Sequence, residues 1–310
     1  MHIEKQIKKS GEYYYLVENI RLPNNRWKKV RIYLGNNLSE IKLQSLKRNK
    51  KKELAEKIRK EKENIDPLLT LISNVQMEKL DSIKKIHKEK IKNLDKLQYR
   101  NYYETFVTEF TYDTNAIEGS TVTLQETAMI LFEHIVPEGK SIREINEVQN
   151  HKDAFDYMLN YKGDLNKTFV LKLHKLLLHN ILWKYAGLFR DVQVYVRGAD
   201  FTPARPQDIE KEFKKMMLWY RSNKKKYNPV LVAAYMHHVF ESIHPFRDGN
   251  GRVGRIVLNF ILRKNGFPMV NIKYKNRSKY YGSLQKSNKG DLKPLIDLII
   301  EYLTESETLI

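Results

Sequence analysis

The twelve residues from His244 to Arg255, HPFRDGNGRVGR, constrain the fold more than any other segment, because they join two helix-forming runs through a glycine-rich turn. Upstream, Asn228 and Pro229 form a helix-start signal, so a helix is predicted as far as Ile243. Downstream, residues 252–264 are apolar on most sides, which predicts a buried central helix. The segment is therefore expected to form a helix-loop-helix motif with its second helix in the core.

The turn inside this motif has the features of an anion site. Glycine tolerates positive φ, so the loop can turn tightly. The backbone N–H groups of Gly249, Asn250 and Gly251 are expected at the positive end of the second helix. Arg252 and Arg255 are three residues apart on that helix, close enough to bind successive phosphates. These five residues are predicted to bind phosphate.

Two neighbouring side chains supply the remaining chemistry of a displacement at phosphorus. Asp248 is a hard oxygen ligand placed to hold Mg²⁺ on the phosphates. His244 can accept a proton near neutral pH, so it is predicted to be the general base for an attacking hydroxyl. The alternative is a plain loop that joins two core helices and leaves its arginines solvated. The distinct role available to each residue favours catalysis.

The segment resembles the HxFx(D/E)GNGRxxR signature of Fic-domain proteins and matches it at every position. The resemblance covers roughly residues 100–305. It implies a mainly α-helical fold and the transfer of AMP from ATP, with Mg²⁺ or Mn²⁺, to a tyrosine, serine or threonine hydroxyl of a protein. It also implies that His244 is the base and Asp248 the metal ligand. Gly249 and Gly251 are changed in the kinase-like toxins of the family, so the loop favours nucleotide transfer over phosphate transfer.

A second segment, residues 114–119 with the sequence TNAIEG, resembles the (S/T)xxxE(G/N) inhibitory motif of some Fic proteins. A helix that ends at Gly119 would present the Glu118 carboxylate from its last turn. The resemblance implies that Glu118 forms a bidentate pair with Arg255 and so blocks productive ATP binding. The alternatives are an ordinary surface helix end, and an enzyme that removes AMP by using Glu118 to position water.

The remaining site predictions concern the acceptor and the nucleoside. Residues 187–209 read as a β-hairpin, and in Fic proteins such a flap covers the site, so a protein target is expected to pair with residues 192–203. The resemblance also implies nucleoside contacts from Asn259, Tyr280 and Tyr281, although core packing would explain either tyrosine equally well. His237, with His238, is interpreted as a core histidine, because no metal-binding carboxylate spacing accompanies it.

Positive charge is concentrated in the N-terminal third of the chain. The net charge is +19 over 310 residues, and residues 1–100 hold 26 lysines and arginines against 13 aspartates and glutamates. Three domains are predicted: an N-terminal β-hairpin module at 1–38, a basic helical arm at 39–98 and a Fic domain at 99–310. The arm's charges favour a solvated helix face, with a nucleic-acid surface as the alternative.

The chain has no cysteine, which excludes cysteine catalysis and agrees with a cytoplasmic setting. It has no apolar run of about 18 residues and no apolar signal-peptide core, so no membrane association is expected. Self-modification and homo-oligomers are compatible with these features. The target, the preferred base and the function of residues 1–98 are left open by the sequence.

Overall fold

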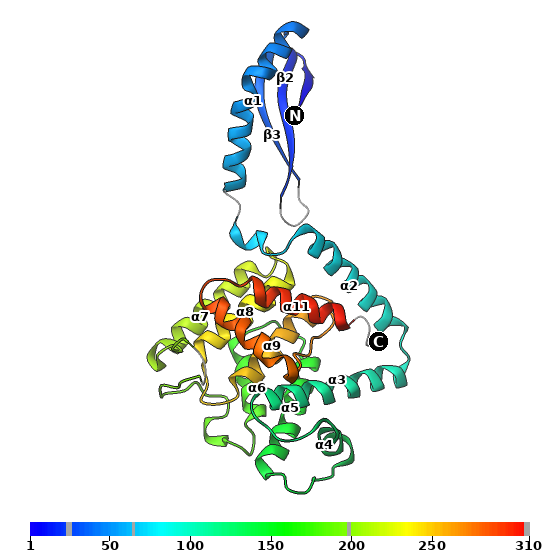
Figure 1. Cartoon of the computed structure of the whole chain (residues 1–310), viewed down its shortest axis with the longest axis vertical. Coiled ribbons are helices and arrows are strands. Elements are labelled where there is room, and N and C mark those ends of the chain that lie inside the picture. The colour runs from blue at the N-terminus through cyan, green and yellow to red at the C-terminus, as the bar shows by residue number, and fades with distance from the viewer. Residues whose placement is uncertain (23–26, 64–65, 197–199, 307–310) are drawn as a thin grey trace. The chain divides into compact units, whose positions relative to one another are not determined.

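The computed structural model describes residues 1–22, 27–63, 66–196 and 200–306 and is mainly helical (Figure 1), as predicted. Its elements, in chain order, are β1 His2–Lys8, β2 Gly11–Arg21, β3 Trp27–Asn36, α1 Glu40–Glu63, η1 Pro67–Thr70, α2 Asn74–Asn93, α3 Lys96–Ile117, α4 Leu124–Ala128, η2 Met129–Glu133, α5 Ile142–Asn160, α6 Lys167–Leu177, η3 Trp183–Tyr185, η4 Pro206–Asp208, α7 Ile209–Asn223, α8 Pro229–Ile243, α9 Asn250–Lys264, η5 Tyr274–Asn276, α10 Arg277–Asn288 and α11 Lys293–Glu305. Among the described residues, no helix is long and apolar enough to cross a membrane.

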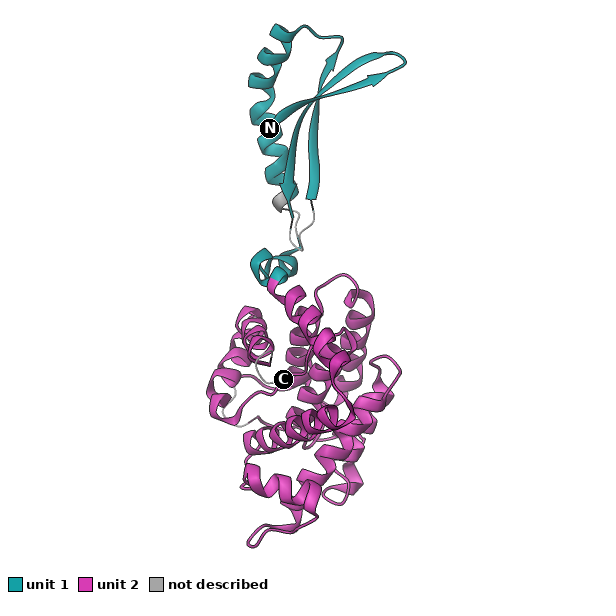
Figure 2. Cartoon of the chain, turned by 90° about the vertical axis from the view of Figure 1, so that its right-hand side faces the viewer, with its two compact units in different colours: residues 1–78 teal, residues 79–310 magenta. Residues whose placement is uncertain are grey.

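The chain forms two compact units, Met1–Glu78 and Lys79–Ile310 (Figure 2). The boundaries predicted after residues 38 and 98 each fall inside one of these units. The first difference has a clear cause, because Leu43 and Leu54 of α1 are buried in the same apolar cluster as the strands. The first half of the expected arm is therefore part of the N-terminal unit.

The N-terminal unit contains one strand more than the expected hairpin. β2 and β3 pair antiparallel as in the expected hairpin, whose turn at residues 23–25 lies outside the described residues, and β1 adds to the far edge of β2 in the order β1-β2-β3. β1 has only Ile3 and Ile7 as aliphatic residues, so its own sequence is a weak strand signal. Pairing with β2, from His2 opposite Val17 to Lys8 opposite Gly11, supplies the stabilisation that its sequence lacks.

Alternate residues of the sheet face α1, as the period of two in a strand requires. The buried residues of this cluster are Tyr14, Leu16, Ile20, Val30, Ile32, Leu34, Leu43 and Leu54. The sheet thus has one face in the core of the unit. Its other face carries the intervening residues.

In the second unit, α9 is the central helix, with twelve of its fifteen residues buried. It packs against α3, α5, α6 and α8. Asn228 accepts a hydrogen bond from the Val230 N–H at the start of α8, with Pro229 at the first helical position, as the sequence predicted. Because α9 is fixed on several sides, its N-terminus is a rigid base for a site.

Helix α3 brings the second motif to the same region. It begins with a capping box between Asp95 and Gln98 and ends at Ile117. Glu118 is its C-cap residue, and Gly119 follows with a φ of 103°, which a residue with a side chain rarely adopts. The helix ending predicted at Gly119 is therefore present.

The predicted hairpin over residues 187–209 takes a different form where the structure describes it. Residues 187–196 and 200–209 contain no β-strand, and of the turn predicted at residues 197–200 all but Asp200 lies outside the described residues. Side-chain hydrogen bonds replace a strand ladder here. Gln193 donates through Nε2 to the Pro203 carbonyl at 3.3 Å, across the base of the segment.

Candidate active site

The loop between α8 and α9 is held by two left-handed residues and one amide. His244 has φ 50°, which is uncommon for a residue with a side chain, and Gly249 has φ 76°. The Asn250 side chain accepts a hydrogen bond from the Phe246 N–H at 2.8 Å and donates to the Phe246 carbonyl at 2.9 Å. The turn at Gly249 lets α9 begin at Asn250, two residues earlier than predicted.

The N-terminus of α9 has backbone donors directed out of the helix. The first N–H groups of a helix have no intrahelical acceptor, and no side chain caps this end. Gly249 departs from its predicted role, because its N–H donates to Asp248 Oδ1 at 2.6 Å. The side chain of Asn250 is likewise occupied by Phe246, so only its backbone N–H can meet an anion.

Asp248 lies in a ring of donors. Its Oδ2 accepts from Arg143 Nη2 at 2.7 Å, and its Oδ1 accepts from Arg252 Nη2 at 3.1 Å. Burial opposes its ionisation, but the Arg252 charge and the Gly249 N–H outweigh that effect, so the pKa of Asp248 is lowered. An ionised carboxylate beside a phosphate-binding helix end fits Mg²⁺, which is commonly held by one or two carboxylates together with substrate phosphates.

His244 lies at the end of α8 with its ring largely buried. Its Nδ1 is 3.4 Å from the Glu241 carbonyl oxygen and 3.9 Å from Glu241 Oε2. Burial lowers the pKa of His244 below its ordinary value, against the opposing effects of the Glu241 carbonyl and the Glu118 charge. The imidazole is therefore neutral at pH 7, and a proton on Nδ1 directed at the Glu241 carbonyl leaves Nε2 free to accept another.

Arg255 is shared between two groups of α3. Its Nη2 donates to Glu118 Oε1 at 2.7 Å and to the Thr114 carbonyl at 3.1 Å, and its Nε donates to Thr114 Oγ1. Glu118 accepts through one oxygen, so the bidentate pair predicted from the sequence is wrong. The reason is that Thr114, one helical turn before Glu118, occupies the remaining edge of the guanidinium. This contact also gives the hydroxyl residue at the start of the motif a physical function.

The Glu118 carboxylate lies over the first turn of α9. A Cβ added to Gly251 would be 2.3 Å from Glu118 Oε1 and 2.9 Å from Arg255 Nη1. Gly251 therefore makes room for the carboxylate at the helix end where a phosphate would bind. The negative group occupies an anion site of its own chain.

Arg190 is a further organising residue that sequence reasoning did not identify. It is 3% exposed, and its guanidinium donates to the carbonyls of Val192 and His244, each at 2.8 Å, and also to the Ala204 carbonyl. These bonds tie both limbs of the segment expected to form the flap to the loop that carries His244. A fourth acceptor, the Ile243 carbonyl, lies 3.4 Å from Nη2. Carbonyls from three separated places in the chain cannot be matched to one arginine by sequence spacing.

Two of the predicted nucleoside contacts are in the core. Asn259 is 1% exposed and uses its amide for two hydrogen bonds to the Val270 backbone, at 2.8 and 2.9 Å. Tyr280 is 1% exposed, and its hydroxyl is 2.7 Å from His237 Nε2. Both side chains therefore have partners in the core, their nucleoside contacts stay predictions, and the contact of Tyr280 supports the core interpretation of His237. Tyr281 is 44% exposed and donates to the Ile117 carbonyl at 3.3 Å, beside Glu118.

Among the described residues, no cluster of three or more histidines, cysteines, aspartates and glutamates forms a protein-only metal site.

Glu241 is a buried carboxyl next to the site, and burial raises its pKa to about 8, so it is largely protonated at pH 7. It had not been singled out from the sequence, although its place three residues before His244 on a helix puts both on one face.

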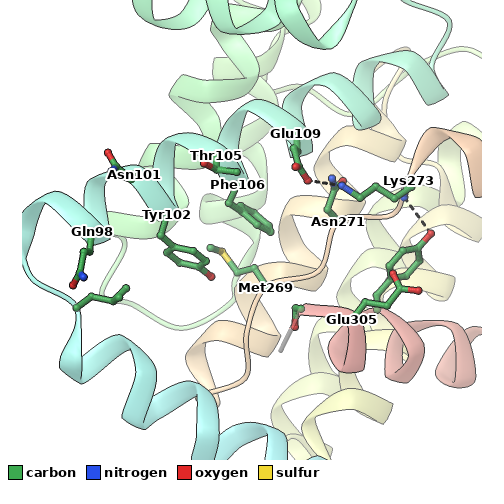
Figure 3. A pocket seen from close by; sticks show the side chains of 13 residues that line it. Gln98, Asn101, Tyr102, Thr105, Phe106, Glu109, Met269, Asn271, Lys273 and Glu305 are labelled. Atoms are coloured by element: carbon green, nitrogen blue, oxygen red, sulfur yellow. Dashed lines mark hydrogen bonds and ion pairs between the residues drawn. The ribbon is translucent and has the colours of Figure 1, made fainter. Parts of the chain in front are cut away.

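A cavity of about 370 Å³ lies elsewhere in this unit, between α3, residues 269–273 and α11 (Figure 3). Tyr102, Phe106 and Met269 line its apolar part, and Glu109 forms an ion pair with Lys273 at its polar end. Because α3 also carries Thr114 and Glu118, this cavity and the contact with Arg255 share one helix.

Comparison with known proteins gives the same family from sequence and from structure. A sequence model described as the Fic/DOC family matches residues 164–262. The chain is 35% identical over 193 residues to protein adenylyltransferase Fic of Nematostella vectensis, covering 61% of this chain and 45% of that protein. It is 37% identical over 194 residues to the protein of the same name from Drosophila persimilis, covering 61% of this chain and 38% of that protein. The chain thus spans less than half the length of these curated relatives.

The fold agrees over a larger share. A solved structure of Fic-1 (residues 134–508) from Caenorhabditis elegans has a TM-score of 0.67 and 31% identity, covering 77% of this chain and 72% of that chain. With the loop geometry, the sequence match and the shared fold in agreement, the chain belongs to the Fic/DOC family.

Proposed function

We propose that the chain is a nucleotidyltransferase that moves AMP from ATP to a tyrosine, serine or threonine hydroxyl of a protein. The observation that carries this proposal is one juxtaposition: a neutral His244 beside a helix N-terminus with two buried arginines and an ionised Asp248. The relatives named protein adenylyltransferase support the choice of AMP. Transfer of another nucleotide would use the same phosphate contacts.

The residues have defined tasks in this reaction. The acceptor hydroxyl oxygen attacks the α-phosphorus of ATP while its proton passes to His244 Nε2. The bond from the α-phosphorus to the bridging oxygen breaks, and pyrophosphate leaves with the electron pair. The first-turn amides of α9 and Arg252 hold the phosphate oxygens as charge develops on them. Arg255 would hold the terminal phosphate.

Asp248 would hold Mg²⁺, or Mn²⁺, against the phosphates. When bound, the cation neutralises phosphate charge and favours departure of pyrophosphate. Arg143 and Arg252 donate to Asp248 at present, so metal binding requires at least the exposed Arg143 to release its oxygen.

Glu118 is proposed to inhibit this reaction. Its carboxylate takes an edge of Arg255 and lies over Gly251, where phosphate oxygens would otherwise bind. ATP has to displace it or bind in a pose unsuited to attack. The hydrogen bonds that Arg255 donates to Thr114 hold the guanidinium in position for Glu118.

The acceptor is proposed to lie along the described part of residues 192–203. Val192 and Tyr195 are exposed there, at 42% and 82%. An extended segment of a target could pair with this backbone without a sequence requirement. Self-modification and homo-oligomers are compatible with this arrangement, and the cytoplasmic setting expected from the cysteine-free sequence stays a prediction.

The test is incorporation of AMP from labelled ATP by the Glu118→Gly variant, with Mg²⁺ and cell lysate, followed by mass spectrometry. A mass increase equal to AMP on a hydroxyl side chain is expected, about tenfold to a hundredfold above the wild-type level, because a charged hydrogen bond of about 1.5–3 kcal/mol no longer competes with phosphate. Glu109→Ala is a matched control, since Glu109 is on the same helix but pairs with Lys273. Absence of any labelled protein in the Glu118→Gly reaction would contradict the proposal.

Removal of AMP is the second candidate, favoured by the position of Glu118 near His244, where its charge opposes the lowering of the His244 pKa by burial. In that reaction Glu118 would orient water toward the modified target. A target modified by the Glu118→Gly variant should then lose AMP when wild-type chain is added, and should keep it when Glu118→Ala is added. Equal release by both chains, or by neither, excludes a role for Glu118 in removal.

A further inference from the structure

The exposed face of the three-stranded sheet is built from aromatic and basic side chains. The cross-strand pairs on this face are Tyr15 with Tyr33, Val17 with Arg31, Asn19 with Lys29 and Arg21 with Trp27, and of these residues Val17 is fully buried. Tyr33 and Trp27 are 48% and 67% exposed. α1 packs against the opposite face of the sheet, as Figure 1 shows. The composition of this face therefore does not come from packing against α1.

The cations on this face are held in place by the rings. The Arg31 guanidinium lies 5.0 Å from the centre of the Tyr15 ring, and Lys8 Nζ lies 5.1 Å from the centre of the Tyr13 ring. Tyr33 contacts both rings, with centroid distances of 5.4 and 6.2 Å. Cation–π contacts of this kind reduce the side-chain entropy that a cation loses when it binds an anion.

This face has an excess of positive charge. On the strands it carries Lys8, Arg21, Lys29 and Arg31, against one carboxylate, Glu4, which pairs with Lys29; Arg21 pairs with Glu78. α1 is basic as well, with ten lysines and arginines against five glutamates over residues 40–63, so it is the exposed rings beside the cations that distinguish the sheet face. The whole unit, residues 1–78, has 18 lysines and arginines against 10 aspartates and glutamates, a net charge of +8. A polyanion is therefore the partner whose charge complements the sheet face.

We propose that the exposed face of the β1-β2-β3 sheet binds the major groove of double-stranded DNA. Neighbouring strands lie about 4.8 Å apart, so three strands span about 10 Å, which fits a B-form major groove about 12 Å wide. The deep and narrow major groove of duplex RNA does not admit such a surface. Tyr13 and Tyr15 are covered by cations and by Tyr33, which leaves Tyr33 and Trp27 as the exposed rings of this face, so single-stranded DNA is included as a competitor in the test.

The test measures binding of the full chain to a labelled DNA duplex of about 20 base pairs by fluorescence anisotropy, at salt from about 50 to 200 mM. Lys8→Ala with Arg31→Ala is compared with Lys42→Ala with Lys52→Ala, which removes the same charge from exposed positions of α1. The sheet variant should bind at least about tenfold more weakly, with the slope of log affinity against log salt reduced by about 1.8. The α1 variant should change affinity less than about twofold, because surface charges away from the groove act only at long range.

A third variant, Lys8→Arg with Arg31→Lys, keeps the charge and should bind nearly as well as wild type. Loss of binding by this charge-preserving variant would contradict the assignment. So would equal losses from the sheet and α1 variants, or no binding at about 50 mM salt. Tighter binding of single-stranded DNA, duplex RNA or polyglutamate in competition would overturn the choice of DNA duplex as the occupant.

Discussion

Both units carry arginine where a phosphate could bind, but they hold it in opposite ways. At the start of α9, Arg252 and Arg255 are each 2% exposed and donate to Asp248, Thr114 and Glu118 of the same unit. On the sheet, Arg31 is exposed and lies over the Tyr15 ring. A buried arginine is pre-organised for one anion geometry and is little screened by salt, whereas an exposed one binds any polyanion and is strongly screened. The difference between the units is one of specificity rather than of residue type.

The change expected to separate the α9 site from the sheet face most strongly is removal of the proposed general base, His244. His244→Ala, made in the Glu118→Gly chain, should reduce the rate of AMP transfer by about 10³-fold, in the range for removal of a general base. Binding of duplex DNA should not change. The measurement is incorporation of labelled AMP beside anisotropy on the same preparations. If the His244→Ala variant still transferred AMP at the original rate, His244 would not be the general base.

Salt concentration should affect binding at the sheet face and at the α9 site very differently. Between about 50 and 200 mM salt, DNA affinity is expected to fall on the order of 10²-fold if four cations meet phosphates. The KM for ATP of the Glu118→Gly chain should change by only a few fold, because its arginines are buried. Parallel titrations measure both quantities. Equal salt dependence of the DNA affinity and of the KM for ATP would show that burial does not shield Arg252 and Arg255 from screening by salt.

The dependence of kcat/KM on pH should show how far burial lowers the pKa of His244. The imidazole acts as a base only when neutral, so transfer is lost as the pH falls through its pKa. Burial lowers that pKa, which places the acid limb of kcat/KM below 6.5, with about a tenfold loss per pH unit beneath it. Loss of Glu118 removes a charge that raises this pKa, so the limb should shift to still lower pH in Glu118→Gly. An acid limb above 6.5 would contradict the burial argument.

The smallest expected effect is on stability. Glu118→Gly removes the acceptor of the Arg255 Nη2 hydrogen bond, and Thr114 keeps the remaining contacts. The free energy of unfolding should fall by about 1–2 kcal/mol, less than for a fully buried pair because Glu118 is partly exposed. Thermal unfolding measures the change. No loss of stability would indicate that the pair contributes little to the resting state.

The parts of the site that the sequence predicted depend on local rules. Asn228 with Pro229 begins α8, glycine permits the turn at Gly249, and Gly119 ends α3, each through backbone geometry readable from a few neighbours. What the sequence did not predict is which distant partner a polar group takes. Asn259 bonds to Val270 and Arg190 bonds to three separated carbonyls, and neither choice follows from spacing. The strand β1 was missed for a related reason, since its stability comes from β2.

The contact between Arg255 and Glu118 has a thermodynamic consequence for this chain. One ion pair contributes to the fold and, in the proposed inhibition, to the block on ATP, so under this proposal the blocked state is also the more stable state. A compound that raises the melting temperature by strengthening this contact would reduce activity. A nucleotide that breaks the contact raises the melting temperature only by the part of its binding free energy that exceeds the cost of the broken pair. A thermal-shift screen on the wild-type chain would thus favour inhibitors over substrates.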